Sequence, residues 1–271
     1  MSWSPGVTAL IVVAVGMVAA GITLLVRRTA RGLGTVDPAP WTATLSYVAT
    51  AYGIVIGFSI LYLFGAFADA RGAVGDEATS IGTAFEEAAL FDDAGADVRH
   101  ALICYAEAAS ADDWPAMREG TAAPEVDAAY ADLVASLGQD APAPEGAFYS
   151  AAATNTVVQI GSISTARETR IVTAATSLPV LLWGLVLGGG LLVVVLLFVV
   201  TLPSSPRTQA VLVGLSTTFT AVLVLLVMAL NNPFAPGPGR VSPTLIDETV
   251  ASMTQSAPEL ADLPCPAAGG S

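Results

Sequence analysis

Charge is scarce in this 271-residue sequence: Asp, Glu, Lys and Arg make up only 12% of it, and lysine is absent altogether. A soluble globular domain usually carries about twice that share of charged residues. Histidine occurs once and cysteine twice. Zinc sites built from His and Cys, and Ser-His-Asp or Cys-His catalysis, would all have to use the same imidazole, that of His100. The sequence also holds no Gly-rich phosphate loop. It therefore predicts no catalytic residue, no metal site and no cofactor.

Hydrophobic residues, in contrast, form 54% of the chain and give it a mean hydropathy of +0.68. Four runs without a charged residue reach the roughly 20 residues that a helix needs to cross a bilayer: residues 7–26, 47–68, 171–202 and 210–230. The first run lacks a basic leader, so we expect a mature helix there and not a cleaved signal. These runs predict an all-α integral membrane protein in a lipid bilayer.

The four runs form two predicted hairpins, with about 100 residues between them. Pro and Gly end the helices in both short turns. The predicted parts are a first transmembrane hairpin (1–68), an acidic helical extramembrane domain (69–170), a second transmembrane hairpin (171–230), a Pro-rich segment after the last span (231–252) and a disordered tail (253–271).

Apolar residues recur at helical spacing in three segments of the inserted domain. Nothing between residues 62 and 82 forces a turn, so the second span is expected to continue out of the bilayer as a stalk. Residues 147–176 are expected to run into the third span in the same way. The apolar positions are Val74, Ala78, Ile81, Phe85 and Ala89; Val98, Leu102, Tyr105 and Ala109; and Val126, Tyr130, Leu133 and Leu137.

The formal charge of −13 is concentrated outside the spans, which argues against a nucleic-acid partner. Short turns rich in arginine favour the cytoplasm, and Arg27, Arg28, Arg31 and Arg207 fall in the two short turns. The acidic domain and both termini are therefore expected outside the cytoplasm. The cysteines could pair there, but a buried thiol at Cys104 and a tail thiol at Cys265 are the preferred expectation.

Several segments in fixed order resemble the bestrophin-like membrane proteins, a bacterial family described as a domain of unknown function. The resemblance extends from about residue 44 to about residue 250. The order of the matching segments is more specific than any one of them. The matching segments are "FGAFADARGAVGDEATSIGTAFEEA", Tyr105, "DDWPAM" at residues 112–117, "RETRIVTAATSLPVLLW" and "NNPFAPGPGRVSP".

The resemblance implies four spans with the soluble helices inserted between the second and third. It also implies a more distant similarity to bestrophins, which are pentameric anion channels whose second helix lines the pore at an apolar neck. In bestrophins the domain between the hairpins is cytosolic, so the resemblance implies the reverse of the orientation that the arginines favour. Their Asn-Pro-Phe segment corresponds to Asn232, Pro233 and Phe234. In calcium-gated members an acidic run follows this segment, whereas here the next carboxylate is Asp247, which argues against a calcium clasp.

Two groups of residues carry the channel hypothesis. The first is an apolar stripe on the second span, which could form a neck in an oligomer or serve ordinary packing and lipid contact: Ile56, Ile60, Phe64 and Phe67. The second is a set of arginines at the ends of spans, which could attract anions in a vestibule or form local ion pairs: Arg71, Arg167 and Arg170.

Three further features concern packing. Gly53 and Gly57 would allow another helix to approach the second span closely. Pro179 and the glycines at 188–190 mark either a hinge or a packing groove, and packing is preferred. Phe234 is expected to enter an apolar pocket near Phe67 and Val74, forming a clamp between the fourth span and the soluble helices.

Two functions of different class remain open from the sequence. One is a homo-oligomeric channel for small anions, a pentamer by resemblance. The other is a non-conducting membrane scaffold or sensor whose helical domain binds a partner.

Overall fold

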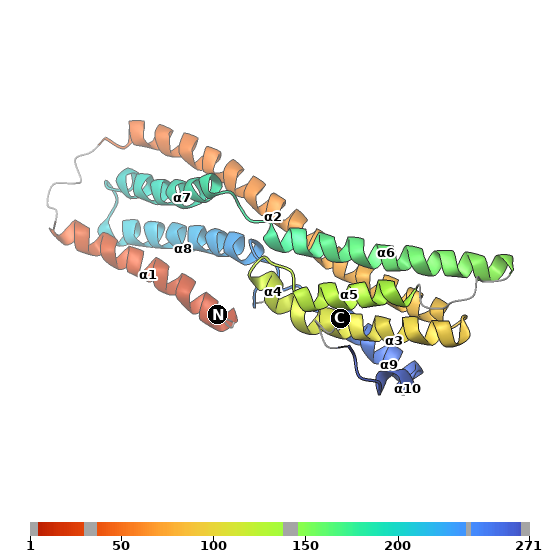
Figure 1. Cartoon of the computed structure of the whole chain (residues 1–271). Helices are drawn as coiled ribbons and strands as arrows, with labels where there is room; N and C mark the ends of the chain where they lie inside the picture. Colours follow the sequence, from red (N-terminus) through yellow and green to blue (C-terminus); the bar gives the residue numbers. More distant parts are fainter. Residues whose placement is uncertain (1–4, 30–36, 138–145, 237–239, 267–271) are drawn as a thin grey trace. The chain divides into compact units, whose positions relative to one another are not determined.

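Helices are the regular elements of the residues that the computed structural model describes, which are 5–29, 37–137, 146–236 and 240–266 (Figure 1). Parts of the first predicted turn, of the Pro-rich segment and of the predicted helical domain (residues 138–145) lie outside these ranges. The helices are α1 (Pro5–Thr29), α2 (Ala39–Ala88), α3 (Asp92–Ala108), a π-helical turn (Ala109–Asp113), α4 (Trp114–Arg118), α5 (Pro124–Ser136), α6 (Ala147–Ala175), α7 (Val180–Val200), α8 (Pro206–Leu230), α9 (Thr244–Ser256) and α10 (Pro258–Ala261).

The chain divides into two compact units. A membrane unit contains Met1–Gly65, Ser177–Asn232 and Pro236–Gly239, and a helical unit contains Ala66–Thr176, Pro233–Ala235 and Arg240–Ser271. Within the described residues, α1, α2, α7 and α8 are long and apolar enough to cross a membrane. The predicted all-α class and the four apolar spans are confirmed.

Glycines allow close helix contacts in the membrane unit. α1 packs against α8, and a Cβ atom at Gly16 would clash with the Thr218 side chain and lie 3.0 Å from the carbonyl oxygen of Gly214. On α7, a Cβ atom at Gly189 would lie 2.7 Å from the ring of Tyr52. The glycines at 188–190 therefore include a packing groove, as preferred from the sequence. Gly53 and Gly57, by contrast, have no such neighbour within 4 Å.

The helix after the inserted domain does not run into the third span, so that prediction is wrong. α6 ends at Ala175, residues 176–179 are not helical, and α7 begins at Val180. Pro179 disfavours a helical backbone at Leu178 and lacks an amide hydrogen of its own. The amide of Leu178 instead donates to Oδ1 of Asn231, with a distance of 2.8 Å.

The core of the helical unit follows the predicted periodicity. α2 continues without a break to Ala88, so the stalk is confirmed as one helix. Ala89 is exposed because the helix has ended before it. The apolar stripes of α2, α3 and α5 bury Val74, Ala78, Ile81, Phe85, Val98, Leu102, Tyr105, Ala109, Val126 and Leu133 in one cluster.

The prediction of a disordered tail is wrong for residues 253–266. α9 places Ile246 and Met253, which are seven residues apart, in the core at 0% and 2% exposure. These two side chains supply the apolar surface through which α9 packs on the core of the helical unit. The expectation of two free thiols is also wrong, because Cys265 forms a disulfide with Cys104 of α3. Residues 267–271 lie outside the described residues.

Candidate functional site

Four charged side chains are buried together in the helical unit. Glu77 of α2, Asp113 of the π-helical turn and Arg170 of α6 are 0% exposed, and Arg167 of α6 is 8% exposed. The two arginines are three residues apart, which places them on one face of α6. Because buried charges are costly unless they are paired and hydrogen-bonded, the contacts of each group decide whether the cluster is stable.

Arg170 contacts two carboxylates and an aromatic ring. Its Nε donates to Oε2 of Glu77, and its Nη2 lies 2.9 Å from Oε1 of Glu77 and 3.2 Å from Oδ2 of Asp113. The guanidinium carbon lies 4.6 Å from the centroid of the Trp114 ring, in a cation–π arrangement. The paired contacts to Glu77 give the fork geometry that makes arginine–carboxylate pairs strong and directional.

Arg167 makes a second fork on the other side of Asp113. Its Nε lies 2.8 Å from Oδ2 and its Nη2 3.1 Å from Oδ1 of that carboxylate. Its Nη1 donates to Asp127 of α5, whose side chain is 61% exposed. Burial alone would lower the pKa of Arg167, but the hydrogen bonds to Asp113 and Asp127 outweigh it and raise the pKa above its ordinary value. Arg167 therefore stays charged.

Tyr105 of α3 completes the cluster. Its hydroxyl donates to Oε1 of Glu77 over 2.7 Å. Burial of the phenol, followed by the nearby negative charge of Glu77, raises the pKa of Tyr105 well above its usual value. Tyr105 therefore remains a protonated donor, and Glu77 receives hydrogen bonds from both Tyr105 and Arg170.

The fully enclosed groups balance in charge: Arg167 and Arg170 face Glu77 and Asp113. The cluster therefore joins α2, α3, the π-helical turn and α6 without leaving a net buried charge. We call it the Arg170 network, defined as Glu77, Tyr105, Asp113, Arg167 and Arg170. Its groups are paired and buried, so Arg167 and Arg170 form the local ion pairs that were the alternative to a vestibule. Their predicted vestibule role stays a prediction. Arg71, the third predicted vestibule residue, is exposed.

The Asn-Pro-Phe segment lies beside this network. Phe234 is 1% exposed and belongs to the same core cluster as Val74, with Phe67 packed against that cluster. Its ring centroid is 6.1 Å from that of Trp114 in an edge-to-face arrangement. Trp114 in turn donates from Nε1 to the carbonyl oxygen of Val241 over 3.0 Å. One indole ring thus contacts both Arg170 and Phe234.

The predicted neck residues do not share one exposed face. Ile56 is 4% exposed, in a cluster with Leu63, Leu178, Val186 and Val227, and Ile60 packs against that cluster. Phe67 packs against the core of the helical unit. Phe64, in contrast, is 57% exposed. The neck as predicted is therefore wrong for Ile56, because that side chain is used in packing within its own chain.

Sequence reasoning missed the Arg170 network, although all five of its members lie in the matching segments. The segment "DDWPAM" supplies Asp113 and Trp114, and "RETR" supplies Arg167 and Arg170. Two arginines three residues apart, just before the third predicted span, could have indicated a pair of buried ionic contacts. Nothing in the sequence identified the carboxylates that they bind.

The comparisons with known proteins agree on one family. The family model described as Bestrophin-like domain matches residues 10–245. A variant of a bacterial bestrophin homologue from Klebsiella pneumoniae is similar in fold, with TM-score 0.72 and 12% identity over 90% of this chain and 98% of that one. Another structure of the homologue has TM-score 0.70 and 12% identity, over 94% of this chain and 99% of that one. At this identity the likeness shows a shared fold. No curated protein matches the chain.

Replacing Arg170 should destabilise the helical unit strongly. The variant Arg170→Met leaves Glu77 buried without its ion pair, and removing one partner of a buried pair costs about 3–5 kcal/mol. Thermal or denaturant unfolding of the purified protein, followed by circular dichroism, measures the loss. The exposed control Arg71→Met should change the unfolding free energy by less than about 0.5 kcal/mol. Adding Glu77→Gln to Arg170→Met should restore part of the stability. If Arg170→Met and Arg71→Met lower the unfolding free energy equally, the buried ion pair of Arg170 does not stabilise the helical unit.

Removing the ring of Phe234 should also destabilise the protein. Phe234→Ala deletes a fully buried ring beside Trp114, and such a change costs about 3–5 kcal/mol. Phe148→Ala is a matched control because Phe148 is 66% exposed. The two variants are compared by the same unfolding measurement. If Phe234 does not stabilise the protein, both variants will have the same unfolding free energy as the unchanged protein.

Proposed function

Because this chain belongs to the bestrophin-like family, we propose that it is a homo-oligomeric membrane channel for small anions. The family match over residues 10–245 carries the proposal. A pentamer is the assembly that the resemblance implies. In this proposal the chain spans the membrane as two hairpins, with the helical unit as a domain inserted between them.

The composition of the spans supports a pore between subunits. None of the four apolar runs contains a charged residue, and a cavity of about 310 Å³ among α1, α7 and α8 is lined mainly by aliphatic side chains. Such a bundle offers no polar path through one chain, so the pore lies on the symmetry axis of an oligomer.

The exposed face of α2 supplies the revised neck. Ile54, Phe58 and Leu61 are 56%, 70% and 67% exposed. Their spacings of four and three residues place them on one side of the helix. A ring of these side chains around an axis would form an apolar constriction that can gate by dewetting. Phe64 borders this face, and exposed Arg71, seven residues later on α2, would attract anions near the constriction.

The disulfide supports an orientation with the helical unit outside the cytoplasm. Disulfides persist in oxidising compartments and are rare in the cytosol. A bond between Cys104 and Cys265 therefore agrees with the arginine-rich short turns, which favour the cytoplasmic side. Both termini would then also lie outside.

Substitution at the proposed neck should change ion conduction. Purified protein in planar bilayers should carry current under a chloride gradient, and Phe58→Ala should change the single-channel conductance by at least about twofold because it widens an apolar constriction. Phe219→Ala on α8, where Phe219 is 63% exposed, is the matched control and should conduct as the unchanged protein does.

Two results would contradict the channel. Reproducible absence of current across voltage and pH would favour the non-conducting scaffold. A native mass equal to one chain of 27.4 kDa, in detergent and in nanodiscs, would remove the symmetry axis that the pore requires.

Labelling of intact cells should test the orientation. A cysteine-free variant with one thiol introduced at exposed Ala111 should react with a membrane-impermeant maleimide. A thiol introduced at exposed Arg207, in the first turn of α8, should react only after the cells are opened. The reverse pattern would place the helical unit in the cytoplasm.

A further inference from the structure

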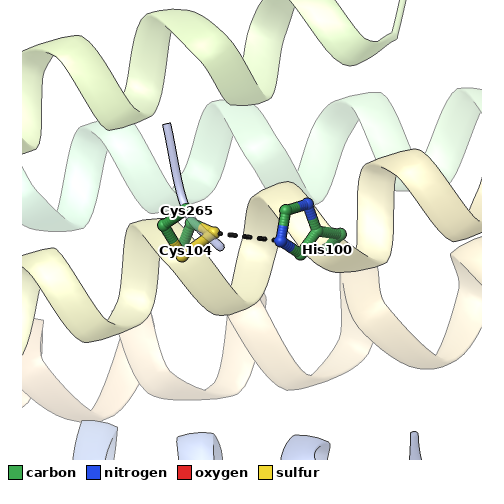
Figure 2. Close-up of side chains that lie close together, drawn as sticks. All are labelled: His100, Cys104 and Cys265. Atoms are coloured by element: carbon green, nitrogen blue, oxygen red, sulfur yellow. Dashed lines mark hydrogen bonds between the residues drawn. A yellow bond between two sulfur atoms is a disulfide. The ribbon is translucent and has the colours of Figure 1, made fainter. Parts of the chain in front are cut away.

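His100, Cys104 and Cys265 lie together in the helical unit (Figure 2), where Cys104 is buried, His100 is partly buried and Cys265 is exposed. His100 and Cys104 are four residues apart on α3, so they share one helix face. Nε2 of His100 lies 3.5 Å from Sγ of Cys104. Cys265 reaches the same place from the C-terminal segment, and the three ligand atoms all lie within 4.8 Å of one another.

These distances suit a tetrahedral metal site once the disulfide is open. With Zn–S bonds of about 2.3 Å and a Zn–N bond of about 2.0 Å, neighbouring ligand atoms in a tetrahedron lie about 3.5–3.8 Å apart. The spacing between His100 and Cys104 already has this value. The two sulfur atoms reach it by moving apart after their bond breaks, and Cys265 can move because it is exposed and lies in a non-helical segment.

A cavity of about 430 Å³ opens beside the three residues, and its lining includes all of them. Carboxylates dominate its polar lining, so its potential attracts cations. A water molecule can occupy a fourth ligand position. The carboxylates are those of Asp97, Asp112, Glu125 and Asp132.

We propose that His100, Cys104 and Cys265 form a binding site for a soft divalent cation such as Zn²⁺ when the disulfide is reduced. Two thiolates and one imidazole are ligands that Zn²⁺ prefers, and three protein ligands with one open position form a common arrangement. The disulfide and the metal exclude each other because both use the same two sulfur atoms. The site goes beyond the channel proposal and does not depend on it.

The switch between the two forms needs a dithiol reductant. A thiolate of that reductant attacks the exposed sulfur of Cys265, and Cys104 leaves as a thiolate. The second thiol of the reductant then releases Cys265, so the disulfide of the protein gains two electrons and the reductant becomes a cyclic disulfide. On metal binding, any protons held by the thiols pass to solvent.

Either form attaches the C-terminal segment to α3. In the oxidised form the covalent bond between Cys104 and Cys265 makes the attachment. In the reduced form the cation would make it, because one ligand comes from that segment and two come from α3. Loss of both would leave the C-terminal segment attached to α3 only by weaker contacts, such as that of His100 with the carbonyl oxygen of Leu263.

Titration of the full-length protein with Co²⁺ tests the site, because thiolate ligands give cobalt a charge-transfer band. The protein in detergent is reduced with a dithiol and desalted under inert gas. We expect a band that saturates at one equivalent of Co²⁺ and that Zn²⁺ abolishes. Bound Zn²⁺ should protect both cysteines from a thiol reagent until a chelator is added. The oxidised protein should show neither effect.

The variant His100→Gln keeps both cysteines and should lower the affinity for Co²⁺ at least about tenfold. Ser136→Ala, at another residue of the same cavity lining, should bind as the unchanged protein does. Circular dichroism checks that the reduced chain and its variants retain their helices. Absence of the band in folded reduced protein, equal binding by the oxidised protein, or unchanged affinity in His100→Gln would each overturn the proposal.

Discussion

The buried pair of Arg170 and Glu77 is the interaction on which the helical unit depends. Both side chains are fully enclosed, and either one alone would be a charge removed from water without compensation. They come from α6 and α2, which are far apart in the sequence, so the pair fixes the relative position of these helices within the unit. A hydrophobic pair could supply similar stability, but it would tolerate sliding of one helix along the other more easily than a forked ion pair does.

The remaining contacts follow from the need to satisfy this pair. Tyr105 gives Glu77 a further donor, and Asp113 accepts from Arg170 while it holds Arg167. Trp114, the residue after Asp113, covers the guanidinium of Arg170 and presents its other contacts to the segment after the fourth span. The position of Phe234 is thus linked through one indole ring to the charges at the centre of the unit.

Periodicity predicted the parts of this fold that repeat along one helix. It could not predict which residues are buried where the number of residues per turn changes. The π-helical turn at Ala109–Asp113 adds residues to a helical turn, so extrapolation from α3 at 3.6 residues per turn does not reveal which neighbouring acid is buried. The structure buries Asp113 and leaves Asp112 exposed.

Tertiary contacts explain the other departures from the sequence predictions. Spacing placed Ile56 and Phe64 on one face of α2, but it could not tell which part of that face the other spans cover. Ile56 is covered and Phe64 is exposed. The disulfide likewise depends on α9 docking through Ile246 and Met253, a long-range contact that no local pattern within the tail encodes.

The two connections between the units differ in stiffness. α2 is one helix from Ala39 to Ala88, and the thirteen residues from Phe64 to Glu77 advance about 20 Å along its axis. The same helix therefore carries both the proposed neck and Glu77, and Tyr105 and Arg170 bind Glu77 through hydrogen bonds. The return connection is interrupted at residues 176–179, and there one hydrogen bond from Leu178 to Asn231 replaces continuous helix. The sequence shows the reason for this difference, because Pro179 ends helical backbone before α7, whereas no proline interrupts α2 after its first turn.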